Sequence, residues 1–253
     1  MKRFFRIIPT LLLKNNGVVK TKQFKYPRYI GDPINIIKIF NEKEADEVCI
    51  LNIDDVRHQV SPNYDHIEEI VSEAFMPVAY GGGIKNVNEV ERLFKIGIEK
   101  IVINSFAVQN IEFVKEISNI FGSQSIVVSL DIKKNLFGKY IIFTQSGTKK
   151  EIIDFESYLE IIQNNGAGEI IINNIDRDGL MRGYDIKLAK LANSKLKIPF
   201  TFLGGAGKKE DLIEAIEVGA SGVSAGSLFI YKGAHNAVLV SYIKNEELFT
   251  DNN

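Results

Sequence analysis

The sequence has very little cysteine, no surplus of either charge and no long apolar run. Its one cysteine, Cys49, cannot form an internal disulfide, which fits a reducing cytoplasm. The chain has 31 Lys and Arg against 32 Asp and Glu, a formal net charge of −1, so its composition predicts neither a nucleic-acid partner nor an anionic membrane. The apolar run at residues 7–13 is far shorter than a membrane span, and no small-residue cleavage site follows it. We therefore expect a cytoplasmic protein with no signal peptide and no membrane partner.

What the sequence does contain is a regular alternation of short apolar runs and amphipathic stretches. Its 253 residues, 45% apolar and 25% charged, suit one α/β barrel or two small domains, and no Pro/Ser-rich linker divides them. Near-continuous apolar runs are typical of parallel strands buried on both faces. The eight runs are residues 6–13, 48–53, 77–80, 100–104, 126–131, 169–175, 199–203 and 222–225. The helix-like stretches between them include residues 33–41, 87–96, 111–121, 155–164, 186–191 and 208–218.

This order of elements predicts a single (β/α)₈ barrel over residues 1–253, with a doubly wound open sheet as the alternative. Residues 138–147 look like a hairpin inserted after the fifth strand, because Gly flanks an apolar core. The chain also repeats itself: residues 46–54 match residues 168–176, and residues 97–105 match residues 219–227, both at an offset of 122. The repeat predicts two half barrels, about residues 1–122 and 123–253, and favours the closed barrel.

Glycine and serine residues follow the strands on two sides of this predicted barrel. The active face of such a barrel lies at the carboxyl ends of its strands, and glycine lets backbone N–H groups approach phosphate oxygens. The residues after the third and fourth strands are Gly82, Gly83, Asn104 and Ser105, and those after the seventh and eighth are Gly204, Gly205, Gly226 and Ser227. We predict a phosphate site on each side, and hence a small ligand with a phosphate at each end. The alternative is that these glycines serve tight turns alone.

Two carboxylates are predicted at the same end of the barrel. Asp131 ends the fifth strand inside the ring, where a general acid or base would sit. Asp178, followed by Gly179, comes after the sixth strand. The internal repeat places Leu12 opposite Asp131. A barrel that works with two facing carboxylates has therefore lost one here, because leucine cannot carry a proton.

Charged side chains are predicted at the opposite end. Strands one, two, four and six begin at Arg6, Glu47, Lys100 and Glu169, so the signs alternate around the ring. One interpretation is a ring of salt bridges that stabilises the fold. The other is a polar gate, through which a small molecule enters the barrel from a partner docked below.

Other catalytic motifs are not found in the sequence. The three histidines, His58, His66 and His235, show no metal-ligand spacing. Cys49 has no second cysteine nearby and lies within an apolar run, which favours a buried core thiol. No Ser-His-Asp order or P-loop pattern is present. We therefore expect no metal and no other cofactor.

Over essentially its full length the sequence resembles the cyclase subunit of imidazole glycerol phosphate synthase, the HisF family. The matching stretches are residues 6–9, 31–33, 80–84, 121–124, 166–170 and 175–179. The resemblance implies a (β/α)₈ barrel, a HisH-type glutaminase partner, and ammonia that crosses the barrel to a ligand with two phosphates. It assigns Asp131 to the family's second catalytic aspartate and Lys20 to its mobile first loop. It also assigns the ring of Arg6, Glu47, Lys100 and Glu169 to the family's ammonia gate, and places Glu99 where an Asp faces the glutaminase.

The sequence departs from the family pattern at three strand ends. Leu12 stands where the family has its first catalytic Asp, Asn52 where it has a second-strand Asp, and Asn173 where it has a strand-six Thr. Residues 8–15, 31–35 and 133–140 resemble a narrower branch, the glycosyl amidation-associated subfamily (WbuZ). That branch implies ammonia supply to a separate enzyme that converts an acetamido sugar to an acetamidino sugar for surface polysaccharide.

Three functions remain open from the sequence. The first, favoured by Leu12, is an ammonia-conducting amidotransferase subunit that serves a sugar-amidating enzyme. The second is a lyase-cyclase of histidine biosynthesis that converts the two-phosphate ribonucleotide PRFAR and ammonia to imidazole glycerol phosphate and AICAR. The third is a subunit that stimulates a glutaminase and has no chemistry of its own.

Overall fold

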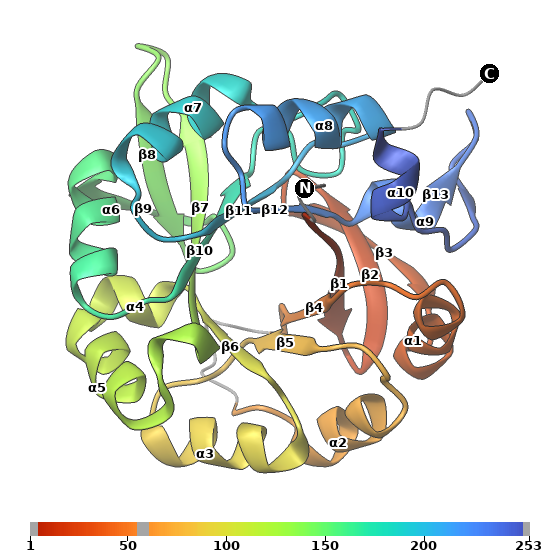
Figure 1. The fold of residues 1–253 in the computed structure, drawn as a ribbon, viewed down its shortest axis with the longest axis horizontal. Helices are drawn as coiled ribbons and strands as arrows, with labels where there is room; N and C mark the ends of the chain where they lie inside the picture. Colours follow the sequence, from red (N-terminus) through yellow and green to blue (C-terminus); the bar gives the residue numbers. More distant parts are fainter. Residues whose placement is uncertain (1–4, 55–60, 250–253) are drawn as a thin grey trace.

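The computed structural model describes residues 5–54 and 61–249, and its centre is a closed barrel of eight parallel strands (Figure 1). In ring order the strands are β1 (Arg6–Lys14), β4 (Val48–Asn52), β5 (Val78–Gly81), β6 (Lys100–Ile103), β7 (Ile126–Lys134), β10 (Glu169–Asn174), β11 (Phe200–Leu203) and β12 (Gly222–Ala225). The pairing of β10 with β7 and that of β12 with β1 close the ring. The predicted (β/α)₈ barrel is confirmed, and the open-sheet alternative is wrong.

Helices surround the barrel in Figure 1. They are α1 (Pro33–Glu42), α2 (Tyr64–Ser72), α3 (Val87–Ile96), α4 (Ser105–Gln109), α5 (Ile111–Phe121), α6 (Phe155–Asn164), α7 (Ile186–Lys195), α8 (Lys209–Glu217), α9 (Ser227–Ile230) and α10 (Asn245–Leu248), with a 3₁₀ turn, η1 (Ser123–Ser125). Polar side chains start several of them: Asp32, Asn86 and Asp154 each accept a backbone N–H of the first helical turn. The predicted stretches did not include α2, α4, α9 or α10.

Antiparallel strands extend β1 and β7 beyond the barrel. Strand β1 continues into a hairpin of β2 (Gly17–Lys22) and β3 (Lys25–Gly31), which the sequence did not predict. Strand β7 pairs with β8 (Tyr140–Thr144), which pairs in turn with β9 (Lys149–Asp154). The predicted hairpin at residues 138–147 is therefore corrected: this segment is the middle strand of a three-stranded extension and the turns on either side of it. A further pair, β13 (Tyr231–Lys232) and β14 (Ala237–Val238), follows α9.

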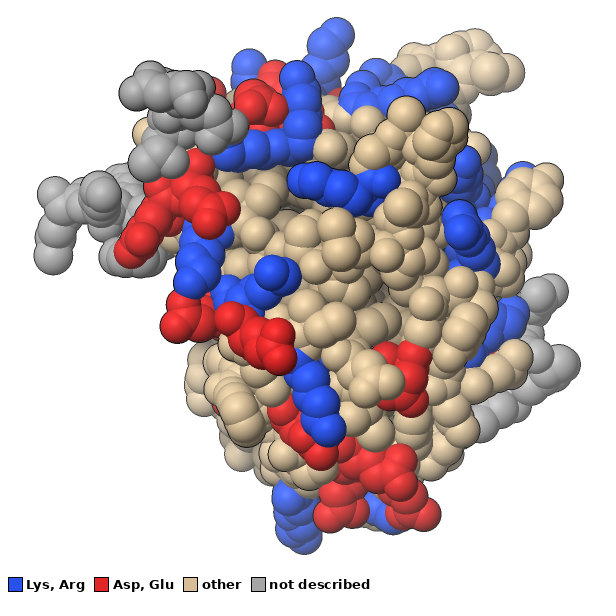
Figure 2. Space-filling model, turned by 90° about the vertical axis from the view of Figure 1, so that its right-hand side faces the viewer, with Lys and Arg blue, Asp and Glu red and all other residues tan. Residues whose placement is uncertain are grey.

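Charges are unevenly distributed over the surface. Figure 2 shows Asp and Glu gathered on the left and at the bottom of one side of the molecule, whereas its upper right carries Lys and Arg among uncharged residues. Within the described part of the chain, no helix is both long enough and apolar enough to cross a membrane.

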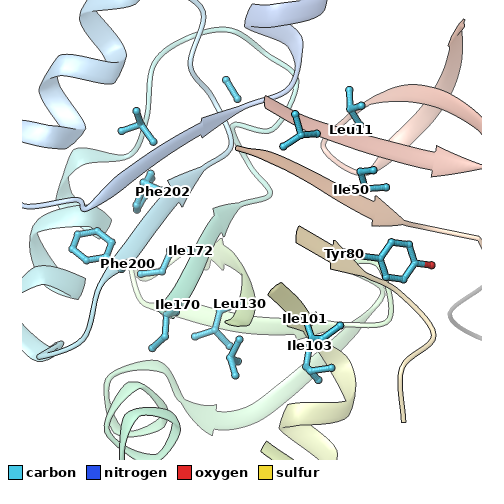
Figure 3. Packing of buried hydrophobic residues seen from close by; sticks show 14 of the residues in the cluster. Leu11, Ile50, Tyr80, Ile101, Ile103, Leu130, Ile170, Ile172, Phe200 and Phe202 are labelled. Atoms are coloured by element: carbon cyan, nitrogen blue, oxygen red, sulfur yellow. The ribbon is translucent and has the colours of Figure 1, made fainter. Parts of the chain in front are cut away.

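The apolar core lies mainly between the barrel and its helices. Strand residues such as Leu11, Ile50 and Phe202 point outward into it (Figure 3) and are almost fully buried. A second, smaller cluster fills the inside of the barrel. Because neighbouring residues of a strand point to opposite faces, both faces of each barrel strand are buried, which explains the near-continuous apolar runs.

Candidate functional site

Asp131 lies on the inner face of β7 at the carboxyl end of the barrel. Its side chain is buried, and its two oxygens accept hydrogen bonds from Asn104 Nδ2 at 2.9 Å and Asn173 Nδ2 at 3.2 Å. Burial raises the pKa of Asp131 to about 7, although both hydrogen bonds act to lower it. A carboxyl group that titrates near neutral pH can both accept and donate a proton. The position predicted for a general acid or base therefore holds a group suited to that chemistry.

Asn173 is a neighbour of Asp131 that the sequence did not assign to the site. It lies directly beside Asp131 in the pairing of β10 with β7. Its Oδ1 atom is buried and has no hydrogen-bond partner among the described residues. In the sequence, a polar residue at the end of a predicted strand was the sign that Asn173 could belong to the site. That it contacts Asp131 follows only from the register between β7 and β10.

Leu12 lies on the inner face of β1, on the far side of the ring from Asp131. It is two residues beyond Thr10 and four beyond Ile8, which belongs to the inner cluster, so all three share one face of the strand. It pairs in register with Leu51 of β4. In the ring order, β1 and β7 are four strands apart and hence opposite. On the inner faces of these two opposite strands, the mouth therefore has the carboxylate of Asp131 on one side and the apolar side chain of Leu12 on the other.

The two predicted phosphate groups lie on opposite sides of this mouth. Gly82 and Gly83 follow β5, and Asn104 and Ser105 follow the adjacent strand β6. The side chains of Asn104 and Ser105 both form hydrogen bonds within the protein. Asn104 Nδ2 donates to Asp131, and Ser105 Oγ accepts the backbone N–H of Gln145 at 2.9 Å. Residues Gly204 and Gly205 follow β11, and Gly226 and Ser227 follow the adjacent strand β12.

Lys20 reaches the second of these groups from the β2–β3 hairpin. Its side chain is buried, and its Nζ donates to the carbonyl oxygen of Thr10 at 2.5 Å. A Cβ atom at Gly226 would lie 2.3 Å from this Nζ, so a larger residue there would displace the lysine from its present position. The structure thus places a cation beside a predicted phosphate loop.

Lys20 also forms an electrostatic pair with Asp178. Burial lowers the pKa of Lys20 to about 8 against the attraction of Asp178, and burial raises the pKa of Asp178 to about 6 against that of Lys20. Both groups are therefore charged near pH 7. Gly179 brings the two segments together: a Cβ there would lie 2.1 Å from Thr21 O, so the hairpin packs directly on this loop.

Four charged side chains close the opposite end of the barrel. Arg6 donates to both oxygens of Glu169, at 2.8 and 2.9 Å, and to Glu47 at 3.1 Å. Lys100 Nζ lies 2.7 Å from Glu47 and 3.3 Å from Glu169. Burial would raise the pKa of Glu169, but Arg6, Lys100 and Thr201 together lower it. Each cation thus bridges both carboxylates, and the predicted alternating ring is formed.

Between this ring and Asp131 the inside of the barrel is apolar. The cluster consists of Ile8, Cys49, Ala79, Val102, Val127, Ile171 and Leu203. Cys49 is buried within it, and burial raises the pKa of its thiol, so the prediction of a core thiol is confirmed. The interior between the charged ring and the polar mouth is therefore apolar.

A cavity of about 710 Å³ opens beside the mouth rather than within it. Its walls include Asn174, Arg177, Tyr184, Asp185 and Lys208, and none of its lining residues is a predicted site residue. Within the described part of the chain, no three His, Cys, Asp or Glu side chains are grouped as metal ligands would be, and His58 lies outside that part.

Comparisons with known proteins agree with this arrangement. Residues 6–236 match the family described as "Histidine biosynthesis protein". The chain is 48% identical to a protein of Leptospira interrogans provisionally named imidazole glycerol phosphate synthase subunit HisF, over 96% of each chain. It is 45% identical to the hisF2 protein of Pseudomonas aeruginosa, over 94% of this chain and 95% of that one. It is also 36% identical to imidazole glycerol phosphate synthase subunit HisF of Petrotoga mobilis, over 89% and 90%.

The chain belongs to the HisF family. The matches span both ends of its barrel, so the mouth with Asp131 and the ring with Arg6 lie within the part shared with HisF relatives. Its ring is complete and its mouth holds Asp131, Lys20 and Asp178. Leu12, on the strand opposite Asp131, has no group that can transfer a proton.

Proposed function

We propose that this chain is the synthase-side subunit of a glutamine amidotransferase, which takes ammonia from a HisH-type glutaminase and supplies it for the amidation of an acetamido sugar in surface-glycan biosynthesis. The reaction at the sugar is carried out by a separate enzyme. The chain would then belong to the glycosyl amidation-associated branch (WbuZ) of the HisF family. Its place of action would be the cytoplasm.

The observation that carries this proposal is Leu12 at the barrel mouth. Ring closure by a cyclase needs proton transfers on both sides of its ligand, and Asp131 is the buried carboxylate on one side only. Loss of one group of an acid/base pair costs about 10²–10⁴ in rate. An apolar side chain at the other position is compatible with ammonia delivery, which requires no acid at that point.

The two ends of the barrel support a route for ammonia. The ring of Arg6, Glu47, Lys100 and Glu169 would act as the gate. We expect Lys100 to be the member that moves, because its one ammonium group contacts Glu47 and Glu169 as a point charge, whereas Arg6 holds Glu169 through two hydrogen bonds. Beyond it, the apolar lumen favours neutral ammonia over the ammonium ion, since an unpaired charge is costly to bury.

The second candidate function is the cyclase itself. Asp131, Lys20 and Asp178 all lie at the mouth, together with Gly179, and glycine residues on both sides could hold a ligand with two phosphates. Under this alternative, Asp131 alone would carry the acid/base chemistry of the conversion of PRFAR to imidazole glycerol phosphate.

An assay of the purified chain separates the two. The chain is supplied with saturating ammonium and the two-phosphate ribonucleotide, and formation of the imidazole ring is followed. We expect very weak or undetectable turnover, and in parallel we expect ammonia-dependent sugar amidation when the sugar-amidating enzyme and its substrate are present. Robust ring formation by the wild-type chain would contradict the sugar-amidation proposal and favour the cyclase.

A further inference from the structure

The two antiparallel extensions of the barrel concentrate positive charge at its mouth. Residues 14–31 and 133–150 contain ten of the chain's 31 Lys and Arg and none of its 32 Asp and Glu. The rest of the chain holds 21 cations against 32 carboxylates, a net charge of −11. A chain with almost no net charge is therefore strongly polarised, an unevenness that Figure 2 shows from one side. Seven of the ten cations are exposed; these are Lys22, Lys25, Arg28, Lys134, Lys139, Lys149 and Lys150, which we call the collar.

Few collar cations are neutralised by neighbours. Lys139 pairs with Asp154 at 3.0 Å, and Lys149 pairs with Glu151 at 3.0 Å. The other five collar cations make no ion pair within residues 5–54 and 61–249; they are Lys22, Lys25, Arg28, Lys134 and Lys150. Two of these five make cation–π contacts, Arg28 with the ring of Tyr231 and Lys134 with the ring of Tyr140. The positive charge of the collar is therefore available to a partner.

Large apolar side chains stand among these cations. Leu136 and Phe137, in the turn between β7 and β8, are 102% and 96% exposed, and Tyr26 and Tyr29 on β3 are 82% and 65% exposed. Burial of such side chains against a partner is worth roughly 1.5–3 kcal/mol each. Exposed aromatic residues and arginine are also the residue types enriched in protein interfaces.

The two extensions form one connected surface. A Cβ at Gly147, in the turn between β8 and β9, would lie 3.0 Å from the ring of Phe24 at the tip of the β2–β3 hairpin. The same tip is fixed to the loop after β10 by a hydrogen bond from Gln23 N to Asp178 O at 2.9 Å. The five residues of β8 separate this junction from Phe137, a span of about 17 Å. The collar is thus broad and held in place by backbone contacts.

We propose that the collar is the docking surface for an acidic face of the enzyme that consumes the ammonia. The inference rests on the proposed function, because it is that function which requires an acceptor enzyme at the mouth. A broad surface with exposed apolar side chains and cations between them has the composition of a protein–protein interface. A small anionic ligand in the mouth would leave Phe137 and Leu136 uncovered. Complementary charge would speed the encounter and fix its orientation, and the docked enzyme would seal the mouth against loss of ammonia to water.

The test compares charge reversals that are matched in size. Lys22→Glu with Lys25→Glu removes unpaired collar charge, and Lys115→Glu with Lys190→Glu makes the same change on the exposed faces of α5 and α7. A second pair compares Leu136→Ser and Phe137→Ser with Ile120→Ser, which is an exposed residue of α5. The probe is the purified sugar-amidating enzyme of the same organism, and the readouts are its Kd for the chain and its amidation rate with glutamine and the glutaminase. The ability of each variant to stimulate the glutaminase shows that its barrel is folded.

We expect both collar variants to raise this Kd at least about tenfold and to lower amidation from glutamine, while the α5 and α7 variants behave as wild type. Binding should also weaken as salt rises from about 50 mM to about 300 mM. Amidation supported by the wild type but unchanged by the collar variants would overturn the docking surface and leave the proposed function intact. No amidation with the wild type would overturn the proposed function, and the partner with it. Binding of the chain to vesicles of phosphatidylserine and phosphatidylcholine, if abolished by the collar variants, would assign the collar to a membrane instead.

Discussion

At residue 12 a leucine side chain faces the inside of the barrel mouth, and across the ring at residue 131 an aspartate is held by two asparagine amides. Leu12 and Asp131 differ in whether they can transfer a proton. Asp131 titrates with a pKa of about 7 and can exchange a proton, whereas Leu12 can do no more than exclude water. The first two predictions test each side of this pair.

Leu12→Asp should increase imidazole-ring formation from ammonium and the two-phosphate ribonucleotide. The new carboxylate would stand opposite Asp131 and restore the second proton transfer, a gain of about 10²–10⁴ if the rest of the site is competent. Leu51→Asp is the control, because Leu51 pairs in register with Leu12 and places an acid on the neighbouring strand instead. Equal gains from the two variants would show that the position of the acid is unimportant and would refute this reading of Leu12.

Asp131→Asn should stabilise the protein at neutral and alkaline pH. Burial raises the pKa of Asp131 to about 7, so in the folded state the charged form is disfavoured. Between about pH 4 and about pH 7 the unfolded chain binds fewer protons than the folded one, and stability falls as pH rises. The asparagine variant lacks this loss and should be about 1–3 kcal/mol more stable than wild type at about pH 8, with no difference near pH 4.

Denaturant unfolding across this pH range measures the difference. Asp65→Asn, at an exposed position of α2, is the matched control and should show no such trend. A difference between Asp131→Asn and wild type that does not change with pH would mean that folding does not shift the pKa of Asp131, and would contradict this prediction.

Among the elements, the β2–β3 hairpin has the greatest effect on the site, because it brings Lys20 to Gly226 and covers the loop that carries Asp178. Gly179→Ala should loosen this contact. A Cβ at residue 179 would lie 2.1 Å from Thr21 O, whereas at Gly233, with nearly the same φ (+71° against +69°), it would meet nothing within 4 Å. Gly233→Ala therefore reproduces the backbone strain without the clash.

Hydrogen exchange reports the loosening directly. The amide N–H of Gln23 donates to Asp178 O, and we expect its exchange to accelerate at least about tenfold in Gly179→Ala but not in Gly233→Ala. If both variants exchange at the wild-type rate, the hairpin is not held by the loop after β10.

The strands and the charged ring could be predicted from the sequence because each is encoded locally. A run such as residues 126–131 is apolar on both faces, and Glu169 at the start of its strand is charged whatever lies around it. The β2–β3 hairpin was missed because it has no turn glycine at its tip, where Gln23 and Phe24 both adopt positive φ. Contacts across the barrel hold this turn, and no local pattern reveals them.

The site was predicted only in part for the same reason. Asp131 could be found from its place at a strand end, but the amides that hold it depend on which strands are neighbours. Likewise, the position of Lys20 follows from the docking of the hairpin and not from its own segment. The roles of the two glycine groups in phosphate binding stay predictions.

At the scale of the whole molecule, the barrel joins a charged ring at one end to a buried carboxylate at the other through an apolar interior. Both β1 and β7, the strands that begin the two halves, are extended by antiparallel strands. This correspondence agrees with the repeat of residues 1–122 and 123–253, which stays a prediction. The two ends therefore differ in chemistry, and we propose that they bind two different partners.

A stable complex with the cognate glutaminase is expected at the ring end. A permanent partner there should bury well over about 1,000 Å² in total. Phe75, which is 87% exposed and lies just before β5, and Glu99, which lies just before β6, are at this end. Glu99→Lys should weaken the complex at least about tenfold, while Glu116→Lys on the exposed face of α5 should not. Failure of the wild-type chain to co-purify with the glutaminase, with ligand present, would remove the basis for a passage.

The most direct test of the account follows the nitrogen atom itself. The chain, its glutaminase and the sugar-amidating enzyme are supplied with glutamine labelled with nitrogen-15 in the side-chain amide, together with an excess of unlabelled ammonium. We predict that the new nitrogen of the acetamidino sugar is mostly labelled, because ammonia passes through the barrel without mixing with the solution. Dilution of the label to the proportion in the bulk ammonium, or its appearance in an imidazole ring when the two-phosphate ribonucleotide is supplied, would contradict the account.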